Sequence, residues 1–134
     1  MRRLPGNVDM RERLLWVAAA SSGFVMVLAG AFGAHGLEGQ VSERLLAAFE
    51  TGVRYQAWHT LAILLILIQR QQQATPGQLL VLGLWATGIL LFSGSLYLMA
   101  LTGVRALGMI TPIGGVSFLA GWLALAAVVW RTRL

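Results

Sequence analysis

Long apolar segments joined by short polar ones constrain this chain more than any other feature of its sequence. Leu14–Ala34, Leu79–Leu101 and Ile113–Trp130 contain no charged residue. A helix of about 20 apolar residues crosses the roughly 30 Å hydrocarbon core of a bilayer. Only 11% of the 134 residues are charged, whereas soluble domains carry about 25%. These observations exclude a water-soluble fold and predict an all-α membrane protein.

A fourth segment is less apolar and needs a separate argument. Its uninterrupted core, Leu61–Ile68, is too short to cross a bilayer, and a length of about 20 residues requires an extension back to Glu50. Polar residues then enter or border the membrane. We predict a single membrane domain over residues 1–134, a compact bundle of four transmembrane helices. The expected spans cover residues 14–34, 50–69, 79–101 and 112–130.

The polar connection between the first two spans is expected to become helical before it enters the membrane. Ser42 is a suitable N-cap, and Glu43 lies in the first turn, where the helix dipole favours an acid. Apolar residues at helical spacing then form one stripe: Leu45, Leu46, Phe49 and Val53. This amphipathic outer-side segment either lies in the membrane interface or extends the second span into water.

The distribution of arginine predicts the orientation of the chain. All 10 basic residues are Arg, and they flank the apolar runs instead of forming a patch with aromatic residues, so we exclude nucleic acid as a partner. Most lie at the chain ends or between the second and third spans: Arg2, Arg3, Arg11, Arg13, Arg70, Arg131 and Arg133. The opposite loops hold Arg44, Arg54 and Arg105. Because basic residues concentrate in cytoplasmic loops, both termini are predicted to be cytoplasmic.

His59 carries the strongest functional signal, because ionisable groups deep in a membrane are rare. If the second span ends near Gln69, His59 lies roughly 15 Å inside it, close to the bilayer midplane. Tyr55, Gln56 and His59 are predicted to share one face that points into the bundle. Hydroxyl groups at similar depth are available to bond the imidazole: Ser22, Ser93, Ser95 and Ser117. His59 is then either a neutral residue that fixes helix register or a site for a proton, a ligand or a quinone.

Other chemistry-bearing residues give weaker signals. His35 lies at the end of the first span, and its depth in the membrane differs from that of His59 by about 15 Å. We therefore do not expect the two histidines to ligate one haem or metal, and we predict no cofactor. Glu50 and Arg54, one helical turn apart, form either a helix-stabilising pair at the outer boundary or a gate or headgroup clamp. No catalytic triad, paired carboxylates or phosphate loop is visible, so we predict no enzymatic activity.

Small residues predict where the helices pack closely. Helices in lipid associate through close backbone approach and polar contacts, since lipid tails are as apolar as leucine. Small residues recur at helical spacing in the first, third and fourth spans: Ala29, Gly30, Gly33 and Gly36; Gly83 and Thr87; Gly114, Ser117 and Gly121. We interpret these residues as packing faces; a ligand groove lined by bare backbone is the alternative.

Four motifs occur in order along residues 20–125: GAFGAHGL (30–37), TGVRYQAWHTLAIL (51–64), LFSGSLYLMALTG (91–103) and GMITPIGGVSFLAGW (108–122). Together they resemble the YgdD-like family, small bacterial inner-membrane proteins with relatives in organisms that have mitochondria. The resemblance implies four spans and a multi-pass location in the bacterial inner membrane. It implies no catalytic residue, because the family is uncharacterised. The motif positions with polar, aromatic or backbone-shaping residues are His35, Arg54, Tyr55, Gln56, His59, Ser93, Tyr97, Thr111, Pro112 and Gly115.

These observations support three hypotheses of function. The first is a non-catalytic accessory or lipid-interacting subunit of a membrane assembly, because the chain is small and has almost no part outside the membrane. The second is a small proton-coupled carrier or channel that uses the face around His59. The third is a quinone- or haem-associated redox component. The expected partners are membrane lipids, together with a larger membrane complex or further copies of the chain.

Overall fold

The computed structural model describes residues 9–132, and this part of the chain is helical with no strand. Arg2, Arg3 and Arg133, which contribute to the predicted orientation, lie outside the described residues. The elements in chain order are α1 (Met10–Phe32), the π-helical turn η1 (Gly33–Leu37), α2 (Glu43–Gln72), α3 (Gln78–Gly88), the π-helical turn η2 (Ile89–Ser93), α4 (Gly94–Thr102), the 3-10 turn η3 (Arg105–Met109) and α5 (Thr111–Arg131).

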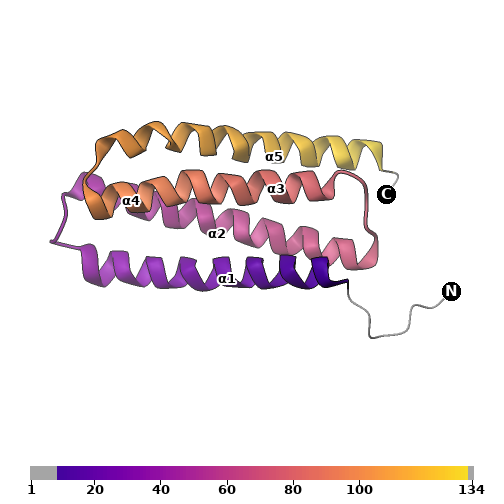
Figure 1. The fold of residues 1–134 in the computed structure, drawn as a ribbon, viewed down its shortest axis with the longest axis horizontal. Helices are drawn as coiled ribbons and strands as arrows, with labels where there is room; N and C mark the ends of the chain where they lie inside the picture. Colours follow the sequence, from indigo (N-terminus) through magenta and orange to yellow (C-terminus); the bar gives the residue numbers. More distant parts are fainter. Residues whose placement is uncertain (1–8, 133–134) are drawn as a thin grey trace.

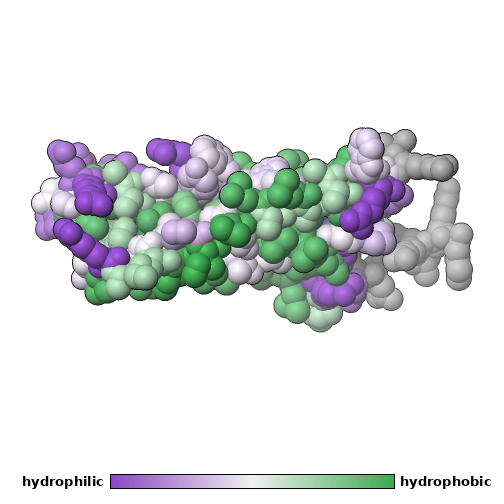
Figure 2. All heavy atoms as spheres, turned by 90° about the horizontal axis from the view of Figure 1, so that it is seen from above, coloured by the Kyte–Doolittle hydropathy of each residue, from purple (hydrophilic) through white to green (hydrophobic). Residues whose placement is uncertain are grey.

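The helices lie side by side along one axis (Figure 1). α3, η2 and α4 form one continuous run, which packs against α2 on one side and α5 on the other, while α1 packs against α2. The start of α1, the turn between α2 and α3, and the end of α5 share one end of the molecule, which we call the terminal end. We call the opposite end the loop end. Hydrophilic residues gather at both ends, and mostly apolar residues cover the length between them (Figure 2).

Within the described residues, three helical runs are long and apolar enough to cross a membrane: Met10–Leu37, Gln78–Thr102 and Arg105–Arg131. The prediction of an all-α membrane protein therefore agrees with the structure. α2 does not meet the same criterion, although its 30 residues make a helix about 45 Å long. Its hydropathy is lower because it contains polar residues, among them Arg54, Gln56 and His59.

α2 begins where its capping signal predicts. The Ser42 hydroxyl accepts a hydrogen bond from the Leu45 backbone N–H at 3.2 Å, which satisfies one of the unpaired donors at the helix start. Of the two alternatives for the amphipathic segment, the structure agrees with an extension of the second span, because the helix runs without a break from Glu43 to Gln72. Phe49, on the predicted apolar stripe, is buried against Leu37 and Ala100 at the loop end. The stripe is thus the core-facing side of the first turns of α2.

The main core lies nearer the terminal end and centres on Trp85. Trp85, Leu67 and Val81 are fully buried, and they bring α2 and α3 into contact with α5 through Phe118. Burial is far lower along α1, where Ala19 is the buried residue. α1 is therefore attached mainly through one face, and most of its surface is available to lipid.

The glycines predicted to mark packing faces behave differently in different helices. A Cβ atom at Gly114 would collide with the backbone of Phe92, and one at Gly121 would collide with the Trp85 indole. The prediction for the fourth span is therefore confirmed. At Gly83 nothing lies within 4 Å, so the predicted close approach in the third span is wrong, because that side of α3 faces outward.

An ion pair ties three helices together at the terminal end. The Arg70 guanidinium donates to Glu12 Oε1 through Nε at 3.2 Å and again through Nη2. Its Nη1 donates to Gln78 Oε1 at 3.4 Å, and the same oxygen accepts from the Thr75 backbone N–H at 2.9 Å. The Arg70 and Glu12 side chains are only 6% and 20% exposed. The pair joins the start of α1 to the end of α2 and the start of α3.

Replacing Arg70 with Gln is expected to lower the free energy of unfolding by about 1–3 kcal/mol, because Glu12 then keeps a sheltered charge without its partner. The measurement is titration of purified protein in mixed micelles with sodium dodecyl sulfate. Arg13→Gln is the control, since Arg13 is exposed on the neighbouring turn of α1. Equal midpoints for the two variants would show that the ion pair does not stabilise the fold.

Candidate functional site

His59 lies in the middle of α2, and both of its ring nitrogens are hydrogen-bonded. Nδ1 lies 2.7 Å from the Tyr55 carbonyl oxygen, which can only accept, so Nδ1 carries the proton. Nε2 accepts from the indole N–H of Trp122 at 3.0 Å. The ring also stacks on Phe118, with centroids 3.7 Å apart. These contacts describe a neutral imidazole with no nitrogen left for a metal or a further proton.

None of the serines expected to reach His59 does so. Ser93 Oγ donates to the Gly52 carbonyl at 2.6 Å, and Ser117 Oγ donates to the Leu84 carbonyl at 2.6 Å. Ser95 pairs with Thr111, and Ser22 pairs with Thr60. A serine side chain is short, so it bonds to the nearest backbone or hydroxyl group. Here those hydroxyls join neighbouring helices to one another or close their own helix turn.

Gln56 is the centre of a second hydrogen-bonded network. Its Oε1 accepts from the Tyr97 hydroxyl at 2.6 Å, and its Nε2 donates to the Ser22 carbonyl at 3.0 Å. The Ser22 and Thr60 hydroxyl oxygens are 2.7 Å apart. Gln56 thus joins α2 to α1 and α4, whereas His59 bonds to α5. Gln56 and His59 both point into the bundle as predicted, being 3% and 4% exposed, but they bond to different helices.

Tyr55 and His59 belong to an aromatic cluster that lines a groove of about 790 Å³. Tyr55 packs against Phe92 with ring centroids 4.8 Å apart. We call this space the α2–α5 groove, and its lining residues are Tyr55, Trp58, His59, Leu61, Ala62, Leu65, Phe92, Pro112, Gly115, Val116, Phe118, Leu119 and Trp122. Many of these side chains are exposed at the molecular surface, including Leu65 and Leu119 at 66% each. The groove is therefore apolar and opens onto the surface that faces lipid.

The π-helical turn η2 helps to shape this groove. It spans Ile89–Ser93 within the continuous run from α3 to α4. Phe92, in this turn, lines the groove, while Ser93 is buried and bonds to α2. Such wide turns are frequent at functional sites. The sequence gives little sign of it, since the flanking residues Gly88 and Gly94 are compatible with an ordinary helix.

The remaining predicted site residues lie apart from His59. Glu50 and Arg54 are exposed and line a smaller hollow of about 290 Å³ between α1 and α2. Their predicted ion pair does not form within 4.0 Å, and the ion pair recorded among residues 9–132 joins Arg70 and Glu12. His35 is exposed in η1 at the loop end. The structure thus joins Tyr55 with His59, and Gln56 with Tyr97, but leaves Glu50, Arg54, His35 and Ser117 outside the groove.

Comparison with known proteins identifies relatives but no activity. A family described as "Protein of unknown function (DUF423)" matches residues 29–115. UPF0382 inner membrane protein YgdD of Escherichia coli (strain K12) is 44% identical over 113 residues, covering 84% of this chain and 86% of the relative.

Two further relatives come from other bacteria. UPF0382 membrane protein SH2409 of Staphylococcus haemolyticus (strain JCSC1435) is 43% identical over 117 residues, 84% of this chain and 92% of the relative. UPF0382 membrane protein YwdK of Bacillus subtilis (strain 168) is 39% identical over 108 residues, 80% of this chain and 88% of the relative. No solved structure matches the chain. These matches confirm the resemblance drawn from the four motifs.

Proposed function

Because the chain belongs to the family of unknown function DUF423, whose curated relatives are named membrane proteins, we propose that it is a non-catalytic, lipid-binding protein with four spans. It is a multi-pass protein of the bacterial inner membrane. The observation that carries the proposal is the α2–α5 groove, an apolar and aromatic space open to lipid. Its volume falls within the range of about 300–1,000 Å³ that is usual for small-molecule sites.

α2 serves as the fourth span in this proposal. A helix crosses hydrocarbon only if its polar groups are satisfied within the protein, because lipid offers no partner. The polar groups of His59 and Gln56 are all engaged by neighbouring helices or by α2 itself. The short hydrophobic core of α2 is then no obstacle to insertion. With four spans, the terminal end is cytoplasmic and the loop end faces outward, in keeping with the arginine distribution.

Two single cysteines test whether α2 crosses the membrane, since the chain has no cysteine of its own. Gln40 and Gln73 are both exposed and lie at opposite ends of α2. In spheroplasts, a membrane-impermeant maleimide is expected to label Gln40→Cys, and to label Gln73→Cys only after lysis. Labelling of both from the same side would mean that α2 does not cross.

A matched pair of leucines on α5 tests the lipid-binding groove. Leu119 lines the groove, whereas Leu123, one turn further along α5, does not; they are 66% and 73% exposed. Leu119→Trp is expected to obstruct the groove and strongly reduce the lipid that remains bound through delipidation, measured by native mass spectrometry. Leu123→Trp should retain it. Equal lipid retention in the two variants would remove the groove as the binding site.

We further propose that this lipid-binding protein works within a larger membrane assembly or as a homo-oligomer. Most of α1 is exposed, including Phe24 at 70% and Val27 at 66%, and among the helices of residues 9–132 it packs mainly against α2. Purification in a mild detergent, followed by native mass spectrometry, is expected to give a mass above that of one chain with its lipid. A monomer free of both partner and lipid would contradict both parts of the proposal.

A further inference from the structure

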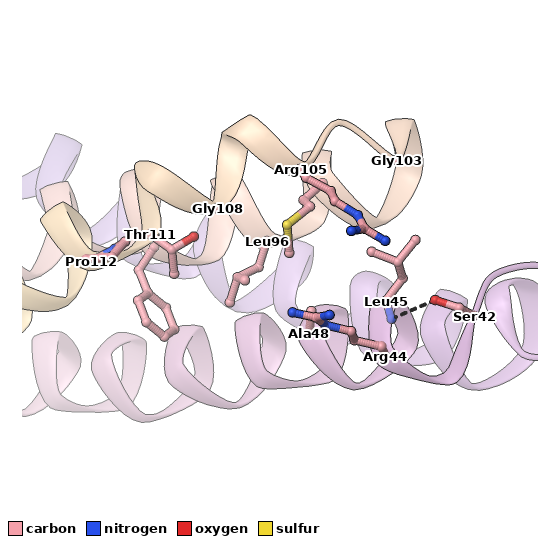
Figure 3. A pocket seen from close by; sticks show the side chains of 12 residues that line it. Ser42, Arg44, Leu45, Ala48, Leu96, Gly103, Arg105, Gly108, Thr111 and Pro112 are labelled. Carbon is pink, nitrogen blue, oxygen red and sulfur yellow. Dashed lines mark hydrogen bonds between the residues drawn. The ribbon is translucent and has the colours of Figure 1, made fainter.

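A second pocket, of about 620 Å³, opens at the loop end, beside the start of α2 (Figure 3). It is lined by Ser42, Arg44, Leu45, Ala48, Phe92, Leu96, Met99, Gly103, Arg105, Gly108, Thr111 and Pro112. Arg44 belongs to α2 and Arg105 begins η3, so the two guanidinium groups extend from opposite walls of the pocket (Figure 3). We call this space the arginine pocket.

The arginine pocket carries two positive charges and no negative one. No aspartate or glutamate lines it, and neither Arg44 nor Arg105 forms an ion pair with any residue between 9 and 132. Glu43, the acid nearest to Arg44 in sequence, is exposed and is not part of the lining. Arg70, in contrast, is neutralised by Glu12 at the terminal end. The pocket is therefore suited to an anion, and a guanidinium group binds phosphate oxygens with directed hydrogen bonds.

The arginine pocket adjoins the α2–α5 groove. Phe92 and Pro112 line both spaces. The first space is lined by the charged residues Arg44 and Arg105 together with apolar residues such as Leu45 and Leu96, and the second is apolar and aromatic. A charged space beside an apolar one matches the chemistry of an amphiphile.

We propose that one anionic phospholipid occupies both spaces, with its phosphate between Arg44 and Arg105. Its acyl chain passes Phe92 and Pro112 and lies along the α2–α5 groove. This inference rests on the proposed lipid-binding function and adds the class of headgroup. Inorganic phosphate would leave the apolar residues of the pocket and the groove uncovered, and the positive headgroup of a zwitterionic lipid would find no acid in the lining.

The proposal also accounts for the position of these arginines. In the orientation proposed above, Arg44 and Arg105 lie on the outer side, against the usual bias of basic residues toward the cytoplasm. An anionic headgroup supplies the missing negative charge.

The test is a competition between lipids on the full-length protein in detergent, followed by native mass spectrometry. The probes are phosphatidylglycerol and phosphatidylcholine with identical acyl chains, with inorganic phosphate as a third arm. The variant is Arg44→Gln with Arg105→Gln. Arg54→Gln is the matched control, since Arg54 is also an exposed arginine of α2 at the loop end but does not line the pocket.

Wild type and Arg54→Gln are expected to prefer phosphatidylglycerol, and the double variant should lose about tenfold or more in affinity for it. Affinity for phosphatidylcholine should fall much less, because its choline cation already opposes binding beside the two arginines, and inorganic phosphate should not compete at equal concentration. A preference for phosphatidylglycerol that survives in the double variant would overturn the inference while leaving lipid binding intact. Equal affinity of wild type for the two lipids would also overturn the inference. If Leu119→Trp then lost both lipids, lipid binding in the groove would still stand. No retention of either lipid by wild type would instead overturn the proposed function.

Discussion

Gly114→Ala is expected to lower the free energy of unfolding by about 3 kcal/mol, the upper end of what overpacking usually costs. A Cβ atom at this position collides with the backbone nitrogen and Cα of Phe92. A side chain can rotate away from such a contact, but a helix backbone can move only with the whole helix. α5 must therefore separate from η2, which also disturbs the wall of the α2–α5 groove. The measurement is the midpoint of sodium dodecyl sulfate titration in mixed micelles.

The neighbouring residue supplies the control. A Cβ atom at Gly115 would lie 3.8 Å from the Phe92 ring, an ordinary van der Waals distance. Because alanine favours a helix over glycine by up to about 1 kcal/mol, Gly115→Ala should be neutral or stabilising. If both substitutions gave the same loss of stability, the close packing of α5 against η2 could not be its cause.

His59→Ala is expected to cost about 3–5 kcal/mol, the range for removing a large buried aromatic ring. The substitution removes the stacking on Phe118 and leaves the Trp122 indole N–H without its acceptor. His59→Phe should recover most of the packing but not the hydrogen bond. Interhelical hydrogen bonds in membranes contribute about 0.6 kcal/mol on average, so the phenylalanine variant should approach the stability of wild type.

The same variants separate a structural histidine from one that carries protons. With both nitrogens engaged, His59 is expected to support no proton flux, and wild type and His59→Phe should leak protons equally in liposomes. A flux present in wild type and absent from His59→Phe, with both proteins equally folded, would restore the proton-coupled carrier as the better hypothesis.

Features that depend on local sequence signals could be predicted. Ser42 caps α2, and Pro112 lies in the first turn of α5, because both residues have strong preferences at helix starts. The packing role of Gly114 and Gly121 follows from their spacing on an apolar helix. The continuity of α2 across the predicted interface segment needed the structure, because an amphipathic stripe looks the same on a surface helix and on an extended span.

The partners of the buried polar groups could not be predicted in the same way. Trp122 lies 63 residues from His59, and an apolar helix gives no sign of which side faces α2. Gln56 finds Tyr97 and Ser22 for the same reason, through helix rotations set by packing. The arginine pocket also depends on the fold, since Arg44 and Arg105 look in sequence like ordinary loop charges.

The most direct test of the account is to locate the lipid on the protein. A phospholipid with a diazirine at the end of one acyl chain would be incorporated into nanodiscs with the full chain and photolysed, and adducts would be mapped by peptide mass spectrometry. Adducts are expected to concentrate on groove residues such as Leu65, Leu119 and Trp122. Leu123 of α5, which is 73% exposed but does not line the groove, should be modified far less. Adducts distributed over all lipid-facing residues in proportion to their exposure would contradict a lipid held in the α2–α5 groove.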